Sequence, residues 1–180
     1  MTRITVHTTD NAPETVRPEL AVLAQQFGKV LNLHGAMAHS PVVIHAYVAF
    51  QQVIVDYGTF DSRTREAIAL VVGSVNECTY CQSAHTISAK TAGLSEDQTI
   101  AIRKGTVDFE TKLAVLLELA RQSTANKGAV KDDAWQAALD AGWTDAELTE
   151  LSAHIAVNLF TNYFNHLVET DLDVPAAPRL

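Results

Sequence analysis

Two short segments of this chain carry the same signals for ending one helix and beginning the next. They are AGLSEDQ at residues 92–98 and AGWTDAE at residues 141–147. In both, a glycine suits the left-handed residue that ends a helix, and Ser or Thr precedes Gln or Glu by three residues, as in a capping box. The pattern predicts helices joined by tight turns. It also hints at a duplicated helical unit, although common helix signals produce the same similarity without duplication.

Other start and stop signals extend this prediction over most of the chain. Ser40 and Pro41 favour a helix start, Gly58 a stop, and Asp61 and Asp108 further starts. No strand alternation extends past the first few residues. The expected fold is therefore all-α, with an N-terminal arm at 1–13, a single helical domain at 14–170 and an extended tail at 171–180. The expected helices cover residues 14–27, 42–57, 62–75, 78–92, 96–104, 109–123, 131–141 and 145–169, and residues 29–39 are ambiguous.

Composition limits the class of protein. Hydrophobic residues make up 47% and charged residues 19%, which suits a globular protein with apolar surface to spare, and such a surplus favours a homo-oligomer. The net charge of -8 and the lack of a Lys/Arg cluster argue against a nucleic-acid partner. No apolar run is long enough to span a bilayer, and the N-terminal residues lack the apolar core of a signal peptide, so we expect no membrane partner and a cytoplasmic location.

Both cysteines of the chain, Cys78 and Cys81, lie in a C-x-x-C spacing. In a reducing compartment such a pair indicates redox or metal chemistry rather than a structural disulfide. With Cys78 in the first turn of a helix, Cys78, Cys81 and His85 share one face. Both sulfurs then lie near the free N–H groups and positive end of the helix, which favours the thiolate, and the i, i+3 spacing allows a disulfide.

His85 and Glu66 are the candidate proton carriers. An imidazole one turn after Cys81 can take or return a proton near neutral pH. Glu66 lies in an otherwise apolar stretch on the preceding helix, where a carboxylate needs a partner, so it can orient His85 or relay protons. Two alternatives remain: these four residues could hold zinc, or the cysteines and the histidine could be inert core residues. The spacing within a regular helix and the shortage of thiolates favour redox chemistry over a metal site, so we expect no metal.

The arrangement E-x11-C-x-x-C-x3-H, from Glu66 to His85, resembles the active-site signature of AhpD-type alkylhydroperoxidases, within the wider carboxymuconolactone decarboxylase-like superfamily. The similarity extends to AGLSEDQ and to NYFNHLVETDLDVP, which is similar to the closing segment of the peroxidase-related branch. The resemblance implies an all-helical fold built on a repeated unit, assembled as trimers or as hexamers made from them.

The resemblance also implies residue roles. Cys81 would be the peroxidatic nucleophile, Cys78 the resolving cysteine, and Glu66 and His85 the proton relay. The substrate would be a hydroperoxide, and the Cys78–Cys81 disulfide would be the redox centre, with no cofactor and with an external thiol or redox protein as reductant. This chain departs from the best-known members at Tyr80, where they have a histidine. A phenol cannot replace an imidazole at neutral pH, so the relay is simpler and peroxidase turnover less certain than thiol redox chemistry.

A few further residues suggest a substrate pocket. Tyr80, His39 and His45 are candidates to line it, although packing is the commoner role for each. On the last predicted helix, polar residues recur every four positions and favour interhelical hydrogen bonding over a pocket: His154, Asn158, Asn162 and His166. Two other functions stay open, namely a decarboxylase or ring-opening enzyme acting on a lactone acid, and a non-catalytic helical or metal-binding module.

Overall fold

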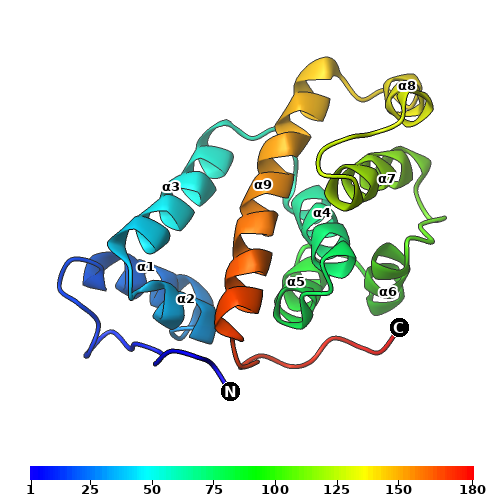
Figure 1. Cartoon of the computed structure of the whole chain (residues 1–180). Helices are drawn as coiled ribbons and strands as arrows, with labels where there is room; N and C mark the ends of the chain where they lie inside the picture. Colours follow the sequence, from blue (N-terminus) through cyan, green and yellow to red (C-terminus); the bar gives the residue numbers. More distant parts are fainter. The chain divides into compact units, whose positions relative to one another are not determined.

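The computed structural model describes residues 1–180 and contains nine α-helices and no strand, which confirms the predicted all-α class (Figure 1). All eight expected helices lie within about three residues of their predicted bounds. The ambiguous segment at 29–39 contains one short helix. The helices are α1 Arg17–Phe27, α2 Asn32–Met37, α3 Pro41–Tyr57, α4 Ser62–Val75, α5 Thr79–Thr91, α6 Glu96–Lys104, α7 Thr111–Ala125, α8 Asp132–Asp140 and α9 Asp145–Val168.

The chain forms two compact units. The first comprises residues 1–57 and 163–173, with α1, α2, α3 and the end of α9. The second comprises residues 58–162 and 174–180, with α4 to α8 and most of α9. All four residues of the predicted redox site belong to the second unit. The single domain expected at 14–170 stays a prediction.

The second unit is organised around α4, which contacts α5, α6 and α7. From Ala67 to Gly73 every residue of α4 is buried. Each large aliphatic side chain removed from water in this way stabilises the fold by about 1.5–3 kcal/mol. The core of this unit consists of Phe60, Ala67, Ile68, Leu70, Val71, Val72, Ala89, Leu94, Ile102, Leu113, Leu116, Leu117, Leu119, Ala120, Ala138, Leu148, Leu151 and Ile155.

The first unit packs the N-terminal arm against α2. The backbone N–H of His7 donates to the carbonyl of Gly35 at 3.1 Å. Gly35 is required there, because a Cβ atom at this position would collide with the His7 carbonyl and the Val6 side chain. Arg3 N–H also donates to the Val168 carbonyl at 2.8 Å, so the arm is docked along its length.

Two helix starts differ from the prediction. The first helix begins at Arg17 rather than Glu14, because Pro18 takes a place in the first turn, where a missing N–H costs nothing. Asp108 does not cap α7, which begins at Thr111. Arg63 donates to Glu110 at 2.6 Å, and Glu110 has an extended backbone at φ -158°. This ion pair, made by a residue distant in sequence, holds the segment before Thr111 extended.

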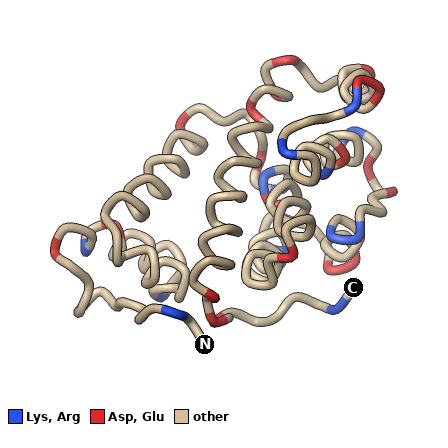
Figure 2. The backbone as a smooth tube through the Cα atoms, in the orientation of Figure 1, with Lys and Arg blue, Asp and Glu red and all other residues tan.

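Charged residues are spread unevenly over the helices. Figure 2 shows α3 almost without charge, whereas α6 and α7 carry residues of both signs and α8 carries only acidic ones. No helix is both long enough and apolar enough to cross a membrane.

Candidate active site at the α4–α5 turn

The turn that joins α4 to α5 is closed by two backbone hydrogen bonds. Glu77 N–H donates to the Ser74 carbonyl at 3.0 Å, and Cys78 N–H donates to the Gly73 carbonyl at 2.9 Å. This is the Schellman pattern that commonly ends a helix, and it requires a left-handed residue. Here that residue is Glu77, with φ 55°. A left-handed non-glycine residue is energetically unfavourable, so the turn that presents Cys78 is strained.

Cys78 is the N-cap of α5 and not a residue of its first turn. Its sulfur accepts the backbone N–H of Cys81 at 3.2 Å. Both cysteines are buried, with exposed fractions of 1% for Cys78 and 3% for Cys81. The sulfur of Cys78 therefore satisfies one of the N–H groups that the helix leaves open, and the thiolate form stays a prediction.

Gly73 allows α4 and α5 to approach closely at the second cysteine. A Cβ atom placed on Gly73 would lie 3.4 Å from the Cβ of Cys81. The helices thus meet beside the cysteine pair, and this close approach fixes the position of Cys81 relative to α4.

His85 and Glu66 form the contact that the sequence predicts. The Nδ1 atom of His85 lies 2.8 Å from Oε2 of Glu66. Because an ionised carboxylate only accepts hydrogen bonds, Nδ1 carries the proton, and Nε2 is the nitrogen that can exchange one. About a quarter of each side chain is exposed, 28% for His85 and 24% for Glu66, so the pair can exchange protons with water.

Opposing effects act on the pKa of His85. Burial lowers the pKa, whereas the charge of Glu66, its hydrogen bond and the charge of Cys78 raise it. The three raising effects together prevail, and the pKa of His85 lies above its ordinary value of 6.5. A protonated imidazole near neutral pH is the form that can donate a proton to a leaving group and stabilise a neighbouring thiolate.

In a second histidine–carboxylate pair of the same unit, the pKa of the histidine is shifted in the opposite direction. Nε2 of His154 lies 3.0 Å from Glu150, which also accepts from the backbone and hydroxyl of Thr59. Burial is the main cause of a lowered pKa at His154, and only 3% of this residue is exposed. Both members of this pair lie on α9, and Glu150 joins α9 to the chain before α4 through Thr59.

The remaining pocket candidates lie in varied settings. Tyr80 is buried in the first turn of α5, with 4% exposed. His39 and His45 belong to the other compact unit, where His39 contacts the Thr5 carbonyl at 2.7 Å and His45 pairs with Glu19 at 3.3 Å. Their roles in a pocket stay predictions.

Of two bonded amide residues beside the site, Asn76 was not predicted, whereas Asn162 belongs to the predicted polar stripe. Asn76 donates to Asn162 on α9 at 2.9 Å and to the Val72 carbonyl at 3.0 Å. In the predicted stripe, Asn158 bonds within α9 to the His154 carbonyl, whereas His166 is exposed. Asn162 is thus the member of the stripe that makes the expected interhelical bond. An asparagine at the end of a helix followed by a C-x-x-C pair is the signal that could have identified Asn76.

The C-terminal tail also contacts α5. Ala177 N–H donates to the hydroxyl of Ser83 at 3.1 Å, and this hydroxyl donates to the Thr79 carbonyl at 2.8 Å. Arg103 on α6 donates to the Pro178 carbonyl at 2.7 Å. The tail contains no helix or strand, and its contacts tie the first turns of α5 to α6.

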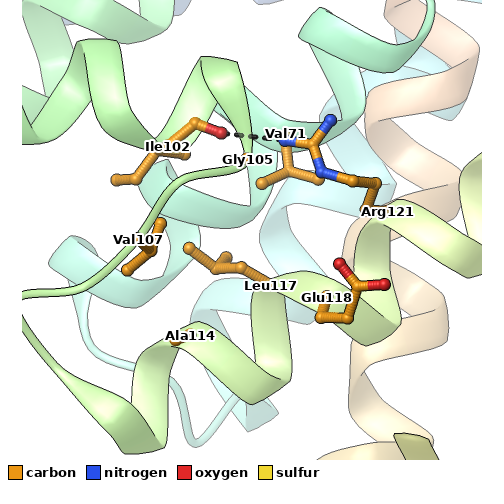
Figure 3. Close-up of a pocket in the computed structure, with 8 residues that line it drawn as sticks. All are labelled: Val71, Ile102, Gly105, Val107, Ala114, Leu117, Glu118 and Arg121. Atoms are coloured by element: carbon orange, nitrogen blue, oxygen red, sulfur yellow. Dashed lines mark hydrogen bonds between the residues drawn. The ribbon is translucent and has the colours of Figure 1, made fainter.

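A cavity of about 200 Å³ opens elsewhere in this unit, between α4, α6 and α7 (Figure 3). None of the predicted site residues lines it. Arg121 at its edge donates to the Ile102 carbonyl at 2.9 Å, next to Gly105 at the end of α6. The guanidinium group therefore supports a helix C-terminus, which is a favourable place for a positive charge. The lining residues are Val71, Ile102, Gly105, Val107, Ala114, Leu117, Glu118 and Arg121.

Known proteins share both part of the sequence pattern and the fold. Residues 41–122, which include the whole cysteine site, match the carboxymuconolactone decarboxylase family. A peroxidase-related AhpD-core protein from Ralstonia eutropha JMP134 superposes with a TM-score of 0.85 at 19% identity, over 96% of this chain and 92% of its own. The segment that holds the cysteine site therefore matches this family, and the chain as a whole has the AhpD-like fold.

Two other solved structures with this fold extend the comparison. A peroxidase-related protein from Silicibacter sp. TM1040 has a TM-score of 0.80 at 18% identity, over 94% of this chain and 91% of its own. The debrominase Bmp8, as a cysteine-to-alanine variant in complex with 2,3,4-tribromopyrrole, has a TM-score of 0.81 at 17% identity, over 96% of this chain and 92% of its own. No curated protein matches the sequence. The superfamily is in general enzymatic, and these likenesses establish the AhpD-like fold of this chain.

Proposed function

We propose that this protein is a thiol-dependent peroxidase or disulfide oxidoreductase that uses Cys78 and Cys81 as its redox centre. The observation that carries the proposal is the geometry of the pair. The sulfur of Cys78 caps α5 by accepting the N–H of Cys81, and both cysteines share the site with the His85–Glu66 pair. The similarity of the whole chain to peroxidase-related structures supports this reaction class.

In the oxidising half-reaction, the thiolate of Cys81 attacks the distal oxygen of a hydroperoxide. The O–O bond breaks, the sulfur becomes a sulfenic acid, and the leaving alkoxide takes a proton from His85 to become an alcohol. Glu66 keeps His85 oriented and protonated for this step, in line with the raised pKa of His85.

In the resolving step, the thiolate of Cys78 attacks the sulfenic sulfur of Cys81. An S–S bond forms, and the hydroxide that leaves is protonated to water. Two equivalents of an external thiol, or one dithiol redox protein, then reduce the disulfide and are themselves oxidised. A reducing, cytoplasmic compartment would supply that reductant. Tyr80 takes no part in the proton relay, because a phenol holds its proton at neutral pH.

Reductive dehalogenation is a second candidate, favoured by the likeness to the debrominase Bmp8 in complex with a tribrominated pyrrole. Here the Cys81 thiolate would take a bromine from carbon, leaving an S–Br bond, and the carbanion would gain a proton from His85. Cys78 would then displace bromide to give the same disulfide. Both candidates are two-electron oxidations of one cysteine pair and differ in the electrophile.

The test is to titrate the thiols of the reduced protein before and after one equivalent of cumene hydroperoxide or of a brominated pyrrole. We expect both thiols to be lost together with the peroxide and Cys81→Ser to abolish the loss. Loss with the brominated pyrrole alone would favour dehalogenation. Retention of both thiols with both reagents would exclude this use of the pair.

The lactone-acid alternative needs no cysteine, so a Cys78→Ser/Cys81→Ser double variant discriminates it. Activity of that variant on a lactone acid would favour a decarboxylase. For the metal-binding alternative, no group of three or more His, Cys, Asp and Glu side chains is arranged to hold an ion. We also propose the trimer or hexamer typical of AhpD-like proteins, which light scattering would measure.

A further inference from the structure

Asn76 occupies the end of α4 and uses both hydrogens of its side-chain amide. One bonds to the Val72 carbonyl at 3.0 Å and the other to the Asn162 side chain on α9 at 2.9 Å. Its backbone N–H also donates to the Val72 carbonyl, at 3.1 Å. Since an amide NH₂ group has two hydrogens to donate, the Asn76 side chain is fixed between α4 and α9.

The chain between Asn76 and Cys81 is short and held at both ends. Glu77 takes the left-handed conformation, and Cys78 N–H donates to the Gly73 carbonyl. The next fixed point is Cys81 N–H, which donates to the sulfur of Cys78. A shift of Asn76 would therefore be transmitted to Cys78 through a single intervening residue.

An asparagine at position 162 stabilises the fold less than an aliphatic residue of similar size would. It is fully buried, and its Nδ2 atom has no hydrogen-bond partner. A buried donor without an acceptor costs free energy that an aliphatic side chain of similar size would not. What Asn162 provides is its Oδ1 atom, which accepts from Asn76.

We infer that Asn76 and Asn162 are positioning residues that hold Cys78 where its sulfur can close a disulfide with Cys81. The inference deepens the proposed function and rests on it for its biological meaning. The amide contact restricts the backbone of Cys78 before any disulfide has formed, so its effect on disulfide formation does not depend on the oxidant. Restricting two reacting groups in this way raises their effective concentration.

The experiment measures the equilibrium between the reduced pair and glutathione disulfide, which yields the Cys78–Cys81 disulfide and two molecules of glutathione. This reaction needs no peroxide, so it separates the inference from the proposed activity. Asn76→Ala and Asn162→Leu should each lower the equilibrium constant about tenfold, because the loss of the amide contact lowers the effective concentration of the two thiols. Their double variant should lose no more than either alone, because both remove one contact.

Two controls separate position from stability. Asn126→Ala removes an asparagine from the same place at the end of α7, and Ser95→Ala removes a cap from α6. Neither should change the equilibrium constant. An unchanged or increased constant in Asn76→Ala, in protein that circular dichroism shows to be folded, would overturn the inference. If the wild type forms the disulfide with glutathione but not with peroxide, the peroxidase proposal fails and the positioning result still decides the inference.

Discussion

The α4–α5 turn and the two turns that share a sequence pattern have the same hydrogen bonds but different residues. The turns after α5 and α8 each contain a left-handed glycine, Gly93 with φ 98° and Gly142 with φ 89°. Leu94 N–H donates to the Ala89 carbonyl and Trp143 N–H to the Ala138 carbonyl, at 3.0 and 3.1 Å. The α4–α5 turn makes the equivalent bond from Cys78 N–H with Glu77 in the place of glycine.

The side chains that cap the next helix repeat the comparison. Each of the three caps accepts the N–H of the residue three positions later at 3.2 Å: Cys78 from Cys81, Ser95 from Gln98 and Thr144 from Glu147. The C-x-x-C pair thus takes the two positions that a capping box occupies in the other turns.

One difference explains how cysteine can replace the second member of the box. Gln98 and Glu147 reach back to the N–H groups of their caps at 2.9 and 2.8 Å. The α4–α5 turn is shorter by one residue, and the N–H of Cys78 is already bonded to Gly73. Cys81 therefore has no capping task for its side chain, and this position is available for chemistry. Because this third turn has the geometry without the sequence, the shared pattern does not require a duplication.

The largest expected effect comes from Cys78→Ser, which separates capping from redox chemistry. The serine hydroxyl can cap α5 as Ser95 caps α6, so the free energy of unfolding should change by less than about 0.5 kcal/mol. Formation of the internal disulfide is lost. Treatment with cumene hydroperoxide in the absence of external thiol should oxidise Cys81 to a sulfenic acid, detected by mass spectrometry after trapping with dimedone. The wild type should instead give the disulfide, and an untrapped variant would contradict the assignment of Cys81.

The next largest effect comes from substituting the left-handed residue. The free energy of unfolding should fall in a turn with glycine and rise in the turn with Glu77. Gly142→Ala should destabilise the protein by about 1–2 kcal/mol, the cost of the left-handed conformation for a residue with a Cβ. No atom lies within 4 Å of that Cβ, so the backbone alone is responsible. Glu77→Gly should stabilise it by up to about 1 kcal/mol. Urea unfolding measures both, and a destabilised Glu77→Gly would show that the carboxylate has a role that outweighs the strain.

A smaller effect is expected from removing the cap itself. Ser95→Ala and Thr144→Ala should each cost about 1 kcal/mol of unfolding free energy. Cys78→Ala should cost less, about 0.5 kcal/mol, because sulfur is a weaker acceptor than a hydroxyl oxygen. The same urea experiment compares the three variants. An equal or larger loss at Cys78 would mean that its sulfur is held as a thiolate, since charged acceptors form stronger bonds.

Local signals account for what the sequence could predict. Gly93, Gly142 and their capping boxes define helix ends within seven consecutive residues, and the spacing from Glu66 to His85 fixes the facing pair. Glu77 carries no signal for a left-handed residue, because glutamate rarely adopts it. The bond from Asn76 to Asn162 joins residues 86 positions apart, beyond the reach of any local pattern. Asp108 was wrong as a cap, because α7 begins after Glu110, whose contact with the distant Arg63 no local pattern predicts.

The smallest expected effect distinguishes the two histidine–glutamate pairs by pH. The pKa of His85 is raised in the folded protein, so its pair with Glu66 stabilises the fold below the unfolded value of 6.5, and this contribution is lost as pH rises through the folded pKa. Glu66→Gln should lower the free energy of unfolding by about 0.5–1 kcal/mol at pH 6 and have little effect at pH 9. Glu150→Gln should not show this dependence, because burial lowers the pKa of His154 in the folded protein instead of raising it. Urea unfolding at the two pH values measures the difference, and a loss at Glu66→Gln that is independent of pH would show that His85 is neutral in the folded protein.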